Sequence, residues 1–411
     1  MMKKYDILFL AGLFPHDTFE DIEKNTKKYL QNAANTLQNL FAEGLEKNAP
    51  GQVRILNSPY VGSFPMLYRK PTIKSYAFKQ MNGTGGYNVG FLNVKYIQQI
   101  SRYRRLKPHI KKWAMEDSPN PKILVAYAST ITFTRLLRYA NSLNRNVLTC
   151  LIVPDLPQYM NVTKKSSFAY NFAKSKEIYL MEKDYRTIDS FVLLTDFMKG
   201  PLNINVPYTV IEGIATTIHP EAEQPDVIDP IKILYTGTLS SKYGILELVE
   251  AFKQIQNQKS RLLICGAGET ESYIQTESEK DDRIIFMGEL SREKILNLQK
   301  NATLLVNPRA NNEEFTKYSF PSKIMEYLSS GTPTLAYKLD GIPDEYYDYM
   351  YTISTESDGL KNSLDEVLSY TKEELQEKGN QAQRFVKNQK NAFEQVKKMI
   401  KMFDGMIDHE S

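Results

Sequence analysis

Short apolar runs alternate with longer amphipathic stretches along most of this 411-residue chain. Runs rich in Val, Ile and Leu that end at Gly, Pro or Asn are typical of buried parallel strands, and the stretches between them are long enough for helices. This alternation predicts parallel sheets with helices on both faces. The expected strands are residues 5–12, 53–57, 122–128, 147–154, 190–195, 208–213, 231–237, 260–266, 283–288, 303–308 and 332–337. The expected helices include residues 27–47, 168–188, 244–256, 292–300, 322–330 and the amphipathic stretch 373–408.

One segment interrupts the alternation. Residues 216–230 are rich in proline and acidic residues and have no apolar period, so they are expected to form a linker. The linker predicts two doubly wound α/β domains, residues 1–217 and 218–390, with a helix of about residues 390–411 packing back on the first domain. Ligands of such domains bind at the carboxyl ends of the strands, so we expect a site in the cleft between the domains.

The formal net charge of +4 hides an asymmetry between the halves. Residues 1–217 carry 29 basic and 16 acidic side chains, whereas residues 218–411 carry 23 and 32, so the net charges are +13 and −9. No acidic residue lies between Glu46 and Glu116, where 13 basic residues do, most densely in residues 101–113. This pattern suits contact with an anionic membrane surface, and a solvated helix face is the alternative. No nucleic-acid motif is present, so no nucleic-acid partner is expected.

Several classes of protein are excluded by what the sequence lacks. Cys150 and Cys265 are isolated in apolar runs, so they are expected to be buried thiols rather than a disulfide or a zinc site. No apolar run could span a membrane and no signal-peptide cleavage site follows the first run, so we expect a cytoplasmic protein. There is no P-loop, no G-x-S-x-G elbow, no paired histidines and no D-x-D pair. The GAGETE run at residues 266–271 lacks the third glycine of a dinucleotide fingerprint.

One expected helix start carries more chemistry than the others. Ser319 is its expected N-cap, Pro321 suits the first turn, and Gly331 is placed to end the helix. A helix N-terminus attracts phosphate, and Lys323 would add a full positive charge there. Glu326 lies three residues on, where its carboxylate can accept two hydrogen bonds from a cis-diol such as a ribose. The alternative is an ordinary Lys–Glu pair on a surface helix.

The second half resembles the family 4 glycosyltransferases, which are retaining enzymes of the GT-B fold that transfer a sugar from a nucleotide sugar. The resemblance is carried, in the family's order and spacing, by ILYTGTLSSKYGILELVEAF, LLICGAGE, IIFMGELSREKILNLQKNATLLVNPR and FPSKIMEYLSSGTPTLAY. The first half is similar more loosely, at the glycine turn of Gly12 and in LQNAANTLQ, VPDLPQYM and VIEGI. The implied fold class is α/β of the GT-B type, with two Rossmann-like doubly wound domains facing a central cleft.

The family's signature pairs two glutamates eight positions apart, and this chain keeps only the second. Glu326 matches the glutamate that holds the nucleotide ribose, whereas Tyr318 replaces the one that usually contacts the donor sugar. In this family the acceptor is thought to attack from the front face, and the leaving phosphate oxygen takes its proton. No protein nucleophile is then required.

The family's diphosphate loop is also altered. It reads GTLSSKYG, with Thr238 in place of the usual arginine, Tyr243 in place of the usual lysine, and Lys242 one position early. Arg309 and Lys323 are therefore candidates to restore the positive charge. The resemblance implies the donor-binding residues Gly237, Thr238, Lys242, Tyr318, Ser322, Lys323 and Glu326.

On the acceptor side the resemblance implies Gly12, His16 and Gln31. The family's frequent His-Asp pair is Pro154-Asp155 here, so the usual histidine position has no titratable group. Asp155 either orients an acceptor hydroxyl or caps the end of a strand. The candidate catalytic residues are Asp155, Lys323 and Arg309.

These features predict a metal-independent transferase without a cofactor, which moves a hexose from a nucleotide sugar, expected to be UDP-linked. The expected acceptor is a glycan or a lipid-linked glycan of capsule, exopolysaccharide or another cell-surface polysaccharide, met at the inner membrane face. The altered positions also allow a non-catalytic transferase-like subunit that supports a partner enzyme. A nucleotide-sugar epimerase and an NAD-dependent protein are further alternatives.

Overall fold

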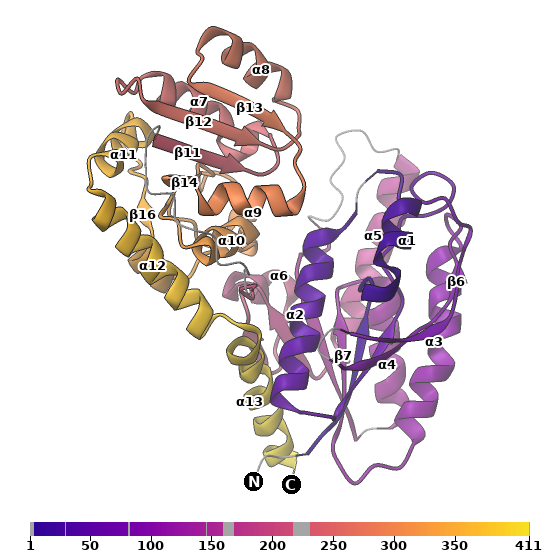
Figure 1. Ribbon diagram of the computed structural model, residues 1–411. Coiled ribbons are helices and arrows are strands. Elements are labelled where there is room, and N and C mark those ends of the chain that lie inside the picture. Colours follow the sequence, from indigo (N-terminus) through magenta and orange to yellow (C-terminus); the bar gives the residue numbers. More distant parts are fainter. Residues whose placement is uncertain are drawn as a thin grey trace. The chain divides into compact units, whose positions relative to one another are not determined.

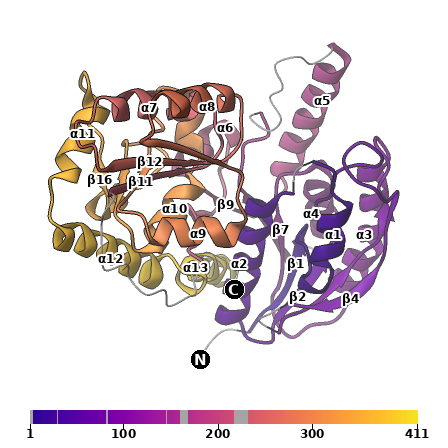
Figure 2. The same cartoon turned by 45° about the horizontal axis from the view of Figure 1, so that its top comes forward.

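The computed structural model describes residues 4–28, 30–80, 83–144, 146–158, 168–216 and 231–410. The chain divides into two compact units, Met1–Ile214 with Ala392–Ser411 and Ala215–Asn391. Each unit contains a mainly parallel sheet between layers of helices (Figures 1 and 2). The linker predicted for residues 216–230 lies outside the described residues apart from Thr216. None of the helices in the described ranges has both the length and the apolar character needed to cross a membrane.

The sheet of the first unit has the strand order β10-β9-β8-β7-β1-β2-β5-β4. All neighbours are parallel except β4, which pairs antiparallel with β5. The strands are β1 (Asp6–Ala11), β2 (Val53–Asn57), β4 (Tyr76–Lys79), β5 (Gly85–Asn88), β7 (Lys122–Tyr127), β8 (Val147–Val153), β9 (Ser190–Leu193) and β10 (Tyr208–Val210). A separate antiparallel pair is formed by β3 (Thr72–Ile73) and β6 (Phe91–Leu92). The six strands predicted for this half are confirmed, whereas β3 to β6 were not predicted.

The helices of the first unit cover both faces of its sheet. They are α1 (Phe19–Asn25), α2 (Asn32–Asn48), α3 (Gln98–Met115), α4 (Ile131–Leu143), α5 (Phe168–Tyr185), α6 (Lys199–Leu202) and α13 (Ala392–Glu410). α2 and α13 lie side by side on one face, where Phe41 and Phe403 pack against strand residues such as Phe9 (Figure 1). On α4, Leu136 and Leu137 are fully buried, and this helix contacts both β7 and β8.

The sheet of the second unit is entirely parallel, with the order β13-β12-β11-β14-β15-β16. In chain order this is 3-2-1-4-5-6, the arrangement of dinucleotide-binding folds. The strands are β11 (Ile231–Thr236), β12 (Ser260–Cys265), β13 (Ile284–Gly288), β14 (Leu304–Asn307), β15 (Thr334–Ala336) and β16 (Tyr351–Thr352). The strand order reverses between β11 and β14, so ligands are expected at the carboxyl ends of these two strands.

Alternate residues of the central strands pack on opposite helical layers, as a buried parallel strand requires. Ile233 of β11 belongs to a core with α7 (Ile245–Lys253), α8 (Glu271–Lys280) and α11 (Gly359–Leu368), whereas Leu234 belongs to a core with α9 (Arg292–Lys300) and α10 (Ser322–Ser330). α12 (Lys372–Gln389) packs on α10. The stretch predicted to be helical over residues 373–408 is therefore two helices, α12 and α13, in different units. Both predicted buried cysteines are buried and free.

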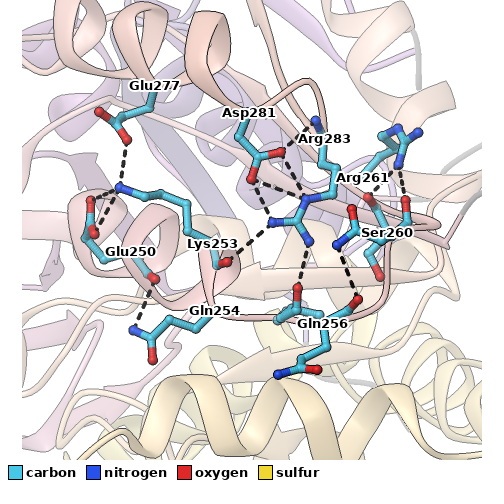
Figure 3. Close-up of polar contacts among 11 residues, drawn as sticks. Glu250, Lys253, Gln254, Gln256, Ser260, Arg261, Glu277, Asp281 and Arg283 are labelled. Atoms are coloured by element: carbon cyan, nitrogen blue, oxygen red, sulfur yellow. Dashed lines mark hydrogen bonds and ion pairs between the residues drawn. The ribbon is translucent and has the colours of Figure 1, made fainter.

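A polar network holds the end of α7 to the start of β13 in the second unit (Figure 3). The Arg283 guanidinium donates to both carboxylate oxygens of Asp281 and, over 2.6 Å, to the carbonyl of Ile255. The backbone carbonyl of Lys253 accepts a hydrogen bond from Arg283 Nη2 over 3.3 Å, and the Lys253 ammonium forms an ion pair of 2.7 Å with Glu277. These contacts lie at the amino ends of the strands, so they stabilise the edge of the sheet opposite the expected ligand site.

Candidate functional site

Two loops meet at the carboxyl ends of β11 and β14. Gly244 ends the loop after β11 with φ +73°, a conformation that L residues other than glycine rarely adopt. A Cβ atom on Gly244 would lie 2.0 Å from the carbonyl oxygen of Pro308, directly after β14. Only glycine therefore allows the two loops to approach this closely.

The loop after β11 also contacts the loop after β12. Gly237 donates its backbone N–H to the carbonyl of Cys265 over 3.0 Å. Gly266 has φ +144°, and a Cβ atom on it would lie 1.8 Å from the Gly237 carbonyl oxygen. The glycines of GTLSSKYG and GAGE thus allow the loops after β11, β12 and β14 to meet at the carboxyl ends of the strands.

The serines of GTLSSKYG are held by Glu269 of GAGE. The hydroxyls of Ser240 and Ser241 donate to Glu269 Oε1 over 3.0 and 2.9 Å. Thr238 and Lys242, two of the seven residues predicted to bind the donor, flank these serines and are exposed. Glu269 therefore fixes the loop after β11, and the side chains of Thr238 and Lys242 face solvent.

Arg309 is the buried cation of this region, at 8% exposure. Its guanidinium lies 5.5 Å from the ring centroid of Tyr243 and 4.8 Å from that of Phe315. One Nη2–H bond reaches Ser319 Oγ over 3.2 Å, while Nε has no hydrogen-bond partner among the described residues. Burial lowers the pKa of the Arg309 guanidinium, but arginine remains cationic in proteins. The site thus holds a desolvated positive charge without a carboxylate partner in the described part of the chain.

The helix that was predicted from this segment is present, but its predicted cap is wrong. α10 spans Ser322–Ser330 as expected, and Gly331 ends it with φ +82°. Pro321 is the N-cap and has no side-chain acceptor for a cap bond, while the hydroxyl of Ser319 accepts from Arg309 and donates to the carbonyl of Phe315. The exposed Ser322 is the first helical residue, at the end of the helix that attracts anions.

Lys323 and Glu326 form a pair on α10 that is tied to the end of β11. Lys323 Nζ lies 2.7 Å from Glu326 Oε1, and Gln299 Nε2 donates to the same oxygen over 2.6 Å. Gln299 Nε2 also lies 3.0 Å from Thr236 Oγ1. Burial alone would raise the pKa of the Glu326 carboxyl, but Lys323, Gln299 and the nearby Arg292 outweigh it and lower the pKa.

Both hydrogen bonds that the described residues donate to Glu326 go to Oε1. Its other oxygen, Oε2, remains to accept hydrogen bonds from a ligand. Because the side chain is only 19% exposed, such a ligand would replace little water and would meet a fixed carboxylate.

Tyr318 replaces the family's first glutamate but stands next to another carboxylate. Its hydroxyl lies 3.4 Å from Glu314 Oε1, and Lys317 Nζ lies 3.3 Å from the same oxygen. The Lys317 ammonium also sits 5.0 Å from the Tyr318 ring centroid. The phenol hydroxyl is therefore the polar group that this chain offers at that position.

The acceptor-side residues predicted from the first half lie after β1 and at the start of α2. Gly12 is buried and donates its N–H to Gln38 Oε1 over 2.6 Å. His16 is exposed and lines a cavity of about 740 Å³, together with Phe14, Asp17, Phe19, Glu20, Asn35, Asn39, Ala42, Glu43 and Gln80. Gln31 is the exposed N-cap of α2 and does not line that cavity. Of the three predicted acceptor-side residues, His16 alone is among those that line this cavity.

Asp155 follows β8 at the carboxyl edge of the same sheet. Part of the residue is exposed, and burial of its carboxyl group raises its pKa to about 6. Burial is the main cause that raises the pKa of the Tyr127 phenol at the end of β7, and the nearby negative charge of Asp155 raises it further. A carboxyl group with a raised pKa at the carboxyl edge of a parallel sheet is a candidate to accept a proton or to orient a hydroxyl.

Three side chains that shape the site were not predicted. Tyr243 and Phe315 enclose Arg309, and Gln299 joins Glu326 to the sheet. Tyr243 lies in the altered loop GTLSSKYG itself, so an aromatic residue in place of the usual lysine was the sequence feature that could have indicated its role. Nothing in the run LNLQK marks Gln299 as fully buried. In the described part of the chain, no three His, Cys, Asp or Glu side chains come together as a metal site.

Residues 220–392 match the family model of the group 1 glycosyl transferases. The glycosyl transferase match therefore covers GTLSSKYG, Arg309 and α10. No curated protein sequence matches the chain.

Solved structures similar to the whole chain are known glycosyl transferase folds. HepE (Alr3699) from Anabaena in complex with UDP has 12% identity and a TM-score of 0.62, over 97% of this chain and 100% of HepE. Sucrose-phosphate synthase from Thermosynechococcus elongatus has 15% identity and a TM-score of 0.61, over 98% and 100%. The lipopolysaccharide outer core galactosyltransferase WaaB has 13% identity and a TM-score of 0.59, over 98% and 99%. The two units are accordingly Rossmann-like domains of the GT-B fold.

Proposed function

We propose that this protein is a retaining glycosyltransferase that moves a hexose from a UDP-linked sugar without a metal or other cofactor. The observation that carries the proposal is the Lys323–Glu326 pair at the start of α10, tied through Gln299 to the end of β11. It lies in the part of the chain that matches the group 1 glycosyl transferases. Complexes of similar folds with UDP and UDP-glucose support the choice of nucleotide.

The proposed roles follow from where charge is available. Glu326 Oε2 accepts hydrogen bonds from the ribose hydroxyls. The diphosphate binds at the α10 N-terminus, where Ser322, Lys323 and Arg309 supply N–H groups and positive charge. Gly237 and Thr238 lie beside the diphosphate, and the exposed Lys242 adds a further cation from the loop after β11. Tyr318 contacts the donor sugar through its hydroxyl in place of the missing glutamate.

The reaction breaks the bond between the sugar and the nucleoside diphosphate, so negative charge develops on the diphosphate. Preorganised cations lower the free energy of that transition state because they are already oriented and partly desolvated. Arg309 is held between two rings and needs no reorganisation to act. The acceptor hydroxyl attacks on the same face, its proton passes to the leaving phosphate oxygen, and Asp155 orients that hydroxyl.

The proposed acceptor is a glycan or a lipid-linked glycan in the synthesis of capsule, exopolysaccharide or another cell-surface polysaccharide. The proposed location is the cytoplasm, at the inner face of the membrane. Two buried, unpaired cysteines suit a reducing compartment, and the basic first half suits an acceptor held at an anionic surface.

The decisive experiment is a screen of nucleotide sugars with the full-length protein in the presence of EDTA. We expect saturable binding of UDP and slow hydrolysis of one UDP-sugar, with retention of the anomeric configuration in any transfer product. Failure to bind any nucleotide sugar would overturn the proposal. Activity that requires a divalent metal would overturn its metal-independent form.

The altered sugar-binding position favours one alternative, a non-catalytic subunit that supports a partner transferase. Tyr318 cannot provide the carboxylate of the usual first glutamate, and its hydroxyl is already close to Glu314. A protein that binds no nucleotide sugar but raises the activity of a co-purified transferase would support this alternative.

A further inference from the structure

The first unit carries an exposed apolar cluster next to the basic helix α3. Twelve large apolar side chains are exposed among the described residues, and seven of them come from residues 66–100, of which all but Tyr87 belong to the cluster. Tyr96 is the most exposed of them, at 84%. The apolar cluster is made of Met66, Leu67, Leu92, Tyr96, Ile97 and Ile100.

These side chains come from segments that the backbone joins. Phe64 and Val94 form a β-bridge, and the Phe64 N–H donates to the Asn93 carbonyl over 2.8 Å. The Leu92 N–H donates to Ser101 Oγ on α3 over 2.9 Å. The segment around Phe64, the end of β6 and the start of α3 therefore lie next to one another.

The apolar cluster continues into a basic stripe along α3. Leu106, Ile110 and Trp113 face the core of the first unit. On the opposite side, Ile97, Ile100, Arg104 and Lys111 follow one another at spacings of three, four and seven, so they share the outward face. The expectation that all of residues 101–113 are either solvated or membrane-facing is wrong for Arg102, which is buried and packs on Phe91 at 4.2 Å.

The backbone at Tyr96 is strained while its side chain is exposed. Its φ is +69°, in the left-handed region that a residue other than glycine rarely adopts. Lys95 Nζ lies 4.9 Å from the ring centroid, so the segment offers a cation and an aromatic ring together. Strain of this kind persists where the surrounding structure holds it, and it is common at functional surfaces.

The charge around the cluster identifies what it can bind. Residues 47–115 contain 13 basic and no acidic residues. Arg104, Arg105, Lys111 and Lys112 are exposed on α3, whereas Lys70 is paired with Asp21 of α1 over 2.7 Å. Two copies of this surface would repel each other, and an apolar protein patch would leave the cations uncompensated. A bilayer with anionic headgroups matches both the apolar and the basic part.

We propose that the apolar cluster and the outward face of α3 dock this protein on an anionic lipid bilayer. Tyr96, Ile97 and Ile100 enter the boundary between headgroups and acyl chains, and Arg104 and Lys111 contact headgroup phosphates. The contact is peripheral. It gives the proposed membrane location a defined surface, and it does not depend on the chemistry of the second unit.

The test is co-sedimentation of the full-length protein with phosphatidylcholine vesicles, with and without phosphatidylglycerol. We expect binding only to the anionic vesicles, weakened by salt. The double variant Arg104→Glu with Lys111→Glu should lower the apparent affinity for anionic vesicles by about fivefold for each basic charge removed. The two new negative charges should lower it further. Ile97→Ser with Ile100→Ser and, separately, Tyr96→Gly should each lower it at least about fivefold without lowering the Tm.

Matched controls come from exposed positions of the second unit. Lys387→Glu and Ile285→Ser change the same residue types and should bind vesicles like the wild type. Equal binding of all variants, or no binding by the wild type, overturns the proposal. A dimer in solution that is dissociated by Ile97→Ser with Ile100→Ser also overturns the proposal, because the apolar cluster is then an interface between copies. UDP binding is measured on the same samples, so a loss of vesicle binding with intact UDP binding is distinguished from a failure of the proposed reaction.

Discussion

The Lys323 ammonium lies 2.7 Å from Glu326 Oε1, three residues further along α10. Gln299 binds the same oxygen from the neighbouring helix, so the carboxylate is fixed on one side and available on the other. Lys323 and Gln299 outweigh the effect of burial and lower the pKa of the Glu326 carboxyl, which favours its ionised form. A nucleoside diphosphate has the complementary pattern of a neutral diol and an anionic diphosphate. The proposed function assigns the diol to Glu326 and the diphosphate to Lys323, both on one helix turn.

Replacing Glu326 by alanine is expected to raise the Kd for UDP by about 10- to 100-fold, the effect of losing hydrogen bonds to a charged group. The fold should persist, because Glu326 is not part of an apolar core and Gln299 keeps its contact with Thr236. Calorimetry with UDP and with 2′,3′-dideoxy-UDP makes the test specific. The wild type should prefer UDP, and the Glu326→Ala variant should not distinguish the two. Glu293→Ala on α9 is the control, and an unchanged UDP affinity in Glu326→Ala would refute the ribose assignment.

Arg309→Met should lower the turnover of the UDP-sugar by roughly 10²–10³-fold, because a desolvated cation at the leaving diphosphate is lost. Methionine keeps much of the apolar contact with Tyr243 and Phe315, so the Tm should change little. Lys323→Met is expected to act in the same direction. Arg261→Met, at the amino end of β12, serves as the control for loss of an arginine in the same unit. A change of less than a few-fold in both Arg309→Met and Lys323→Met would place the stabilising charge elsewhere.

The raised pKa of Asp155, about 6, gives a pH dependence with a definite sign. The Asp155 carboxylate, which is proposed to orient the acceptor, is present above this pH and is lost as the pH falls through it. Turnover should therefore decrease below about pH 6 in the wild type. Asp155→Asn should turn over more slowly at neutral pH and should lose this acidic limb. An Asp155→Asn variant with the wild-type profile would leave Asp155 as a strand cap.

Local sequence patterns were sufficient for most of the fold. The strand at Val53–Asn57 and the helix at Ser322–Ser330 were predicted with the bounds that the structure shows, because a β-branched run and an apolar period of 3.6 are local signals. The two-residue strands β3 and β6 were not predicted, since they are too short to show any period. The 18-residue helix α12 and the 19-residue helix α13 merged into one predicted stretch because only Lys390 and Asn391 separate them.

The candidate site was predictable only where its residues are close in sequence. Lys323 and Glu326 share one helical turn, so their contact follows from helix geometry. The enclosure of Arg309 by Tyr243 depends on the approach of two loops that are 60 or more positions apart, which needs the whole sheet. The wrong N-cap has the same origin: Ser319 has good capping chemistry, but a tertiary contact with Arg309 competes for its hydroxyl.

The network of Figure 3 should contribute to stability and not to activity. Arg283→Met removes the hydrogen bonds to Asp281 and to the Ile255 carbonyl, and it should lower the unfolding free energy of the second unit by about 2 kcal/mol. UDP affinity should be unchanged, because these residues lie at the amino ends of the strands. Lys361→Met breaks an exposed pair with Asp365 and is expected to leave the Tm unchanged. Loss of UDP binding in a folded Arg283→Met protein would contradict this separation.

Two glycine substitutions should change stability in opposite directions. Gly244→Ala places a Cβ atom against the Pro308 carbonyl and requires φ +73°, so it should cost about 2 kcal/mol or more. It should also weaken UDP binding, because the loops after β11 and β14 can no longer meet. Gly405→Ala lies within α13, where a Cβ atom meets nothing within 4 Å, so it should stabilise the first unit by about 0.5–1 kcal/mol. Thermal unfolding and UDP titration of both glycine variants test these two expectations. A Gly244→Ala protein with wild-type Tm and UDP affinity would show that the close approach of the loops is dispensable.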